Sequence, residues 1–191
     1  MPARALISTI WLDVRASALI EHEAAKRPRV ETGGALFGFG SGEELVVACA
    51  YGPGPRAKHR RSSFEPHRGT TDALIRAVWN ASDGRYRYLG SWHTHPGGSA
   101  RPSATDLHTT ESVARDSAVR LPRPLVLIQA TRLGDGGPVM SERRVWHWST
   151  DSEWLLPCEL ESFDLENRLC PEVSVPAGRM RGPQLLRPDI S

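Results

Sequence analysis

SWHTHPGGSARPSATD, residues 91–106, is the stretch on which our interpretation of the chain depends. His93 and His95 are separated by one residue at the end of a predicted strand, so both imidazoles point to the same side of it. After a segment rich in glycine and proline, Ser103 begins a predicted helix with Asp106 in its first turn. Two imidazole nitrogens and one carboxylate oxygen leave the fourth position of a tetrahedral zinc ion open, which is typical of a catalytic site.

Each part of this pattern also has an ordinary structural interpretation. A His-x-His pair on a strand is often structural or solvent-facing, and Ser103 with Asp106 three residues later is the capping box that begins many helices. Peptide hydrolysis at zinc needs a base that takes a proton from water, and Glu31, beside a glycine-rich segment, is our candidate. Ser103 is then the donor to the oxygen that becomes negative in the transition state. Only the joint order and spacing of these residues favour catalysis.

Five positions resemble the signature of the JAB/JAMM (MPN+) metalloproteases without a gap or a substitution: Glu31, His93, His95, Ser103 and Asp106. The flanking segments ETGGALFG and LGSWHTHP fit the same family, and the resemblance covers roughly residues 5–150. It implies an α/β (α+β) fold, JAB/MPN-like and similar to cytidine deaminases, with a central mixed β-sheet flanked by helices. It also implies Zn²⁺ bound by the two histidines and the aspartate, with Glu31 as general base and Ser103 as oxyanion partner.

The activity that this resemblance implies is cleavage after the C-terminus of a ubiquitin-like protein, either from its conjugates or from a precursor. The chain is most similar to stand-alone bacterial JAB isopeptidases of ubiquitin-like conjugation in antiphage operons (CBASS-type or Bil-type), with the cognate E1- and E2-like enzymes as further partners. Three alternatives remain open: a peptidase that trims a sulfur-carrier protein, a catalytically silent MPN binding module, and a relative of bacterial DNA-repair JAB proteins. Silent modules typically lose ligands, whereas this chain keeps all of them.

Composition agrees with a soluble enzyme and excludes some other classes. The 191 residues are enough for one core, and their net charge of +2 is too small to indicate nucleic-acid binding. No apolar run approaches the roughly 18 residues of a membrane span, and we expect a cytoplasmic protein without a signal peptide. Cys49, Cys158 and Cys170 form no CxxC pattern, so we expect buried free thiols and no disulfide.

The apolar patterns predict three main helices and a mixed sheet. Helices are expected at residues 14–26, 71–80 and 103–116, and strands at 5–12, 31–38, 44–51, 61–64, 86–92, 124–131 and 139–148. We expect a JAB/MPN domain at residues 1–155 and a proline-rich, partly irregular extension at residues 156–191.

Three further features have two interpretations each. The basic cluster of Arg56, His59, Arg60 and Arg61 is a solvated loop or a surface for an acidic modifier. Trp92 is expected in the core, where it could also support a ligand imidazole. The loop 97–98 is flexible or lines a groove in which a substrate tail adds as a strand.

Overall fold

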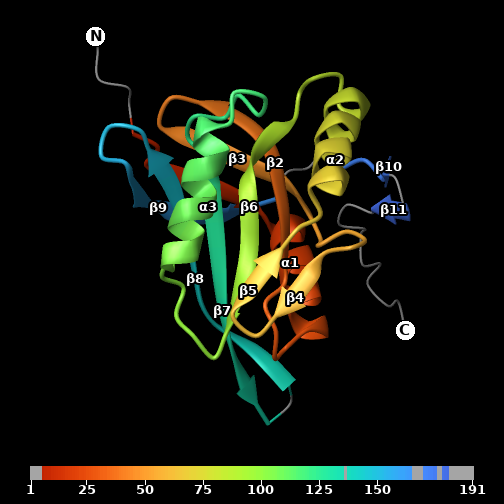
Figure 1. Cartoon of the computed structure of the whole chain (residues 1–191), viewed down its shortest axis with the longest axis vertical. Coiled ribbons are helices and arrows are strands. Elements are labelled where there is room, and N and C mark those ends of the chain that lie inside the picture. The colour runs from red at the N-terminus through yellow and green to blue at the C-terminus, as the bar shows by residue number, and fades with distance from the viewer. Residues whose placement is uncertain (1–5, 136, 165–169, 176–177, 181–191) are drawn as a thin grey trace.

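The computed structural model describes residues 6–135, 137–164, 170–175 and 178–180 (Figure 1). In chain order the elements are β1 (Thr9–Asp13), α1 (Val14–Lys26), β2 (Gly33–Ser41), β3 (Glu44–Tyr51), β4 (Lys58–Arg60), β5 (Ser63–Glu65), α2 (Arg68–Ala81), β6 (Arg87–Pro96), α3 (Ala104–Arg115), β7 (Leu125–Gly134), β8 (Gly137–Ser149), β9 (Trp154–Phe163), β10 (Val173–Val175) and β11 (Gly178–Met180). The mixed sheet and the three predicted helices are therefore present.

The main sheet closes on itself, which differs from the open flanked sheet that we expected. Its strand order is β1-β3-β2-β6-β7-β8-β9, and β1 pairs in parallel with both β3 and β9. Closure depends on β9, a strand that the sequence pattern did not predict. The expected domain boundary between residues 155 and 156 falls inside β9, so the sheet continues to Phe163. Residues 181–191 of the expected extension lie outside the described residues.

The helices lie on two sides of the sheet (Figure 1). α1 begins where the Asp13 side chain accepts hydrogen bonds from the backbone N–H groups of Arg15 and Ala16. Its residues Ala16 and Ile20, four positions apart, are fully buried in the core cluster. In Figure 1, α2 and α3 lie on either side of β6, on the face that points to the viewer, whereas α1 lies behind the sheet. The strand that carries both histidines is thus flanked by two helices.

The cysteines correct one of our expectations. Cys49 on β3 and Cys170 form a disulfide with a sequence separation of 121, whereas Cys158 is a free thiol, as predicted. The Tyr51 hydroxyl donates a hydrogen bond to the Pro171 carbonyl (2.6 Å), close to the disulfide. The disulfide was missed because two cysteines so far apart in the sequence carry no spacing signal.

The structure also bears on the membrane question. Among the described residues, no helix is both long and apolar enough to cross a bilayer.

Candidate metal centre

The two histidines lie on β6, a strand that is paired along both of its edges. β6 pairs with β2 on one edge and with β7 on the other, so His93 is opposite both Gly33 and Ile128. His93 and His95 are two residues apart, and their Nε2 atoms lie 3.0 Å from each other. The backbone of the pair is therefore fixed by hydrogen bonds on both sides, and the sheet itself sets the distance between the imidazoles.

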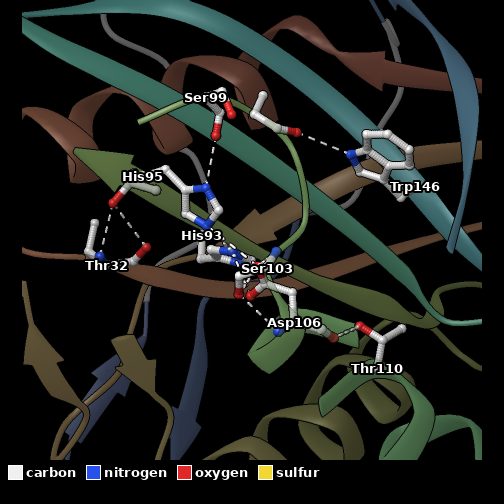
Figure 2. A network of polar contacts seen from close by, with 10 residues as sticks. Thr32, His93, His95, Ser99, Ser103, Asp106, Thr110 and Trp146 are labelled. Atoms are coloured by element: carbon white, nitrogen blue, oxygen red, sulfur yellow. Dashed lines mark hydrogen bonds and ion pairs between the residues drawn. The ribbon is translucent and has the colours of Figure 1, made fainter. Parts of the chain in front are cut away.

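Asp106 reaches the histidines from α3. Ser103 is the N-cap of this helix, and the capping box is complete: the Ser103 N–H and hydroxyl both donate to Asp106 Oδ2 (2.6 and 2.7 Å). This box turns the carboxylate toward β6, where Oδ1 lies 3.1 Å from His93 Nε2 and Oδ2 lies 3.5 Å from His95 Nε2 (Figure 2). The helix start and the placement of the carboxylate thus depend on the same four-residue segment.

The three side chains fit a tetrahedral divalent cation. Metal–ligand bonds of 2.0–2.2 Å at tetrahedral angles imply ligand separations of about 3.3 Å. The two Nε2 atoms are 3.0 Å apart, and Asp106 offers Oδ1 at 3.1 Å from His93 and Oδ2 at 3.5 Å from His95. His95 Nδ1 faces the Ser99 carbonyl at 2.9 Å and must donate to it, which leaves the Nε2 lone pair free for a metal. Among the described residues, this is the one cluster of three or more ligands.

Burial and hydrogen bonds shift the pKa values of Asp106 and His95. Burial alone would raise the pKa of Asp106, but hydrogen bonds from His93 and His95 outweigh it and hold that pKa well below its usual range. Burial acts to lower the pKa of His95, yet hydrogen bonds to Asp106 and Ser99 raise it overall. In the metal-free protein, a proton on His95 is thus stabilised beside the Asp106 carboxylate, so a metal that binds there must displace it.

Glu31 lies just before β2 and is held by the β4–β5 hairpin. Its backbone N–H donates to the Arg60 carbonyl (2.7 Å), and its own carbonyl faces His59 Nδ1 at 3.0 Å. Burial raises the pKa of Glu31, although His93 and His95 oppose that shift. A carboxylate of raised pKa beside a metal site is suited to take up a proton and release it again.

A cavity of about 310 Å³ joins Glu31 to the cluster. It lies between α2, α3, β6 and the β4–β5 hairpin, and Glu31, His93, Ser103 and Asp106 all contribute to its wall. A volume of this size falls at the lower end of the range for ligand pockets. The structure therefore brings all five predicted site residues to one place, since His95 completes the triad beside this wall.

Other predicted positions have different roles. Trp92 is fully buried, and its Nε1–H donates to the Tyr51 carbonyl (2.9 Å), as expected for a core residue. Gly97 and Gly98 do not line the cavity; the Gly97 N–H instead donates to the Thr131 carbonyl (2.7 Å). His59 is more than part of a solvated basic loop, because its ring contacts the backbone of Glu31. The presence of a histidine in that loop was its only sequence signal.

Comparison with known proteins agrees with this geometry. Residues 15–148 match the family model described as "Prokaryotic homologs of the JAB domain". A probable metalloprotease, y4qB, from Sinorhizobium fredii is 30% identical over 131 residues, which are 68% of this chain and 77% of that protein.

Two further relatives carry the name CD-NTase/cGAS isopeptidase. The one from Pseudomonas aeruginosa is 36% identical over 86 residues, 45% of this chain and 54% of its own length. The one from Enterobacter hormaechei is 33% identical over 125 residues, 62% of this chain and 67% of its own length.

The fold is also found in solved structures. The solution structure of DSY2949 from Desulfitobacterium hafniense superimposes with a TM-score of 0.54 at 20% identity, over 82% of this chain and 94% of that protein. From the family model and the relatives together, we conclude that this chain belongs to the prokaryotic JAB-domain family and is a hydrolytic metalloprotease.

Proposed function

We propose that this protein is a zinc-dependent isopeptidase that cleaves after the C-terminal residue of a ubiquitin-like protein. The observation that supports the proposal best is the cluster of His93, His95 and Asp106, whose atoms are spaced for one tetrahedral cation with Glu31 beside it. Zinc held there supplies Lewis acidity, which acidifies water and polarises a carbonyl.

Glu31 transfers the proton in this reaction, and Ser103 stabilises the oxyanion. Glu31 accepts a proton from the attacking water and delivers it to the leaving amine, so one C–O bond forms as the C–N bond breaks and no proton is left over. The raised pKa of Glu31 suits both steps, because the carboxylate must be protonated between them. The Ser103 hydroxyl, which donates to Asp106 Oδ2 in the structure, turns from that oxygen and donates to the carbonyl oxygen as the latter becomes negative.

The names of the relatives suggest the substrate class. Several are called CD-NTase/cGAS isopeptidases, and an isopeptidase cuts a bond between a C-terminal carboxyl group and a lysine amine. We therefore include protein conjugates of a ubiquitin-like modifier, made by E1- and E2-like enzymes of an antiphage system, among the substrates. The cavity beside Glu31 offers space for an extended tail.

The proposal is tested with wild type, Glu31→Gln and the matched control Glu44→Gln, which alters an exposed carboxylate at the start of β3. Zinc content is measured by mass spectrometry. Each protein is then incubated with a ubiquitin-like protein joined to a lysine side chain of a reporter. We expect cleavage by wild type and by the control, and zinc in all three proteins. Turnover by Glu31→Gln should fall by at least about 10²-fold.

Two results would contradict the proposal in different ways. If none of the three proteins binds zinc, the metal assignment is wrong. If Glu31→Gln binds zinc and cleaves as fast as the wild type, the metal assignment stands and Glu31 is not the base.

A further inference from the structure

A second cavity, of about 470 Å³, lies at the opposite end of β6 from the histidines. Its wall combines the C-terminal half of α2, the first residues of β6 and residues 119–123, which lead from α3 to β7. Four of its lining residues are arginines, and we call them the arginine basin: Arg76, Arg87, Arg120 and Arg123. Among the residues that the structure describes, no aspartate or glutamate lines this cavity.

Two arginines of the basin, Arg76 and Arg120, differ in their pairing from Arg68, which lines the first cavity. Near the metal cluster, Arg68 lies 3.3 Å from a carboxylate oxygen of Asp116 and 3.9 Å from one of Asp72. Arg76 and Arg120, by contrast, form no ion pair with any of the described residues. Guanidinium groups gathered around one hollow repel each other, and an anionic ligand relieves that repulsion.

The two cavities adjoin, and we call the pair the groove. Ile75, Tyr88 and Val119 line both of them, and residues of α2 and β6 contribute to the wall of each. Arg87 begins β6 and His93 is six residues further along it. At about 3.3 Å per residue, the arginine basin is roughly 20 Å from the metal cluster, the span of about six extended residues.

We propose that the arginine basin binds acidic residues of the substrate, about six to eight positions before the bond that is cut. This inference rests on the proposed function, because the cleaved carbonyl of an extended tail must lie at the metal cluster. The basin then selects modifiers whose tail is preceded by aspartate or glutamate. A phosphorylated nucleotide also suits arginines, but a nucleotide site would not require a groove that continues to the metal ligands.

The test measures binding, which needs no cleavage. Fluorescein-labelled peptides of ten residues end in Gly-Gly with a free carboxylate and carry either Glu-Glu or Lys-Lys at the seventh and eighth positions from that end. Their affinities are measured by fluorescence anisotropy for wild type, Arg76→Glu/Arg120→Glu, and the control Arg15→Glu/Arg132→Glu. The control removes the same charge outside both cavities.

We expect wild type and the control to bind the Glu-Glu peptide about tenfold more tightly than the Lys-Lys peptide, at low salt. Arg76→Glu/Arg120→Glu leaves two arginines and two glutamates in the basin, so that preference should disappear, whereas the control should keep it. All three proteins are first compared by circular dichroism and zinc content, because Arg15 of the control is half-buried and pairs with Asp164, whereas Arg76, Arg120 and Arg132 are exposed.

The outcomes separate the basin from the proposed activity. Equal affinities of wild type for the two peptides would overturn the basin as an acidic-residue site, even if the enzyme cleaves conjugates. A charge preference of wild type that disappears in Arg76→Glu/Arg120→Glu, in a protein that cleaves no conjugate, would refute the proposed activity and leave the basin as a peptide site. If ATP binds wild type but not Arg76→Glu/Arg120→Glu while neither peptide binds, the basin is a nucleotide site and our inference is wrong.

Discussion

Ser103 has a structural role and a proposed catalytic role, and a substitution that removes both would not tell them apart. Its hydroxyl accepts from the Asp106 N–H (3.2 Å), which caps α3, and donates to the Asp106 carboxylate, which orients a candidate ligand. The same hydroxyl lines the cavity next to the metal cluster. Because capping and oxyanion stabilisation draw on different chemistry, they can be separated by choosing residues that retain only one of them.

We predict that Ser103→Asn keeps most of the stability and loses most of the activity. Asparagine caps helices about as well as serine, so the free energy of unfolding should change little, whereas Ser103→Ala should lower it by about 1 kcal/mol. Both variants lack the hydroxyl, and kcat for a ubiquitin-like conjugate should fall by about 10²-fold. Urea unfolding and single-turnover kinetics measure the two effects. Full turnover by Ser103→Asn would mean that Ser103 is a cap and nothing more.

The candidate ligands could be predicted from sequence because their spacing is local. His93 and His95 lie on one strand, and Ser103 with Asp106 on the first turn of one helix, so period and capping rules place them. The role of His59 could not be predicted. Its ring contacts the backbone of a residue 28 positions away, and that contact exists only once the β4–β5 hairpin has folded over the site.

At the scale of elements, β2 determines how closely the site is packed. It lies between β3 and β6, and Gly34 is opposite Trp92. A Cβ atom at Gly34 would lie 1.8 Å from the Tyr51 carbonyl oxygen and 2.8 Å from the Trp92 indole nitrogen. No side chain fits there, so the glycines after Glu31 are explained by the approach of neighbouring strands.

Gly34→Ala should therefore destabilise the fold by about 3 kcal/mol or more, because the clash is with backbone that is fixed in the sheet. Gly52→Ala is the matched control, since its new Cβ would meet only the flexible side chain of Glu23 at 3.3 Å. Thermal unfolding of both variants measures the difference. Equal melting temperatures would show that β2 and β3 can separate locally at little cost.

Some elements were predicted correctly and others were missed, for physical reasons. α1 and β3 have the predicted bounds. The helix was expected from Ala18, Leu19, Ala24 and Ala25, of which Ala24 is on the buried face, and the strand from the apolar run ELVVACAY. β9 was missed because Pro157, Glu159 and Glu161 interrupt its pattern. Its outer residues remain exposed, so it is defined as a strand by its pairing with β8 across a short turn and with β1 at the other end of the chain.

At the scale of the whole molecule, the disulfide ties the C-terminal segment to the sheet. Val173 packs in one cluster with Leu74 and Val78 of α2, the helix that forms a wall of both cavities. Cys49 and Cys170 thus fasten a segment that supports the groove without contributing any candidate ligand.

Cys170→Ser should lower the free energy of unfolding, by at most about 4–5 kcal/mol for a loop of this length. Zinc content should not change, because no ligand is altered. Cys158→Ala is the control: burial raises the pKa of the Cys158 thiol to about 12, so this group takes little part in thiol chemistry. Chemical unfolding with and without reductant measures the effect. Identical unfolding of wild type in both conditions would show that the disulfide does not stabilise the protein.

The disulfide has one more consequence, which concerns the integrity of the chain. Residues 49–170 form a covalent ring, and His93, His95 and Asp106 belong to it, whereas Glu31 lies on the arm that leads into it. A protease that cuts one exposed loop within the ring opens it but separates nothing. A nicked molecule would therefore run as a single band on a gel until a reductant divides it into two fragments.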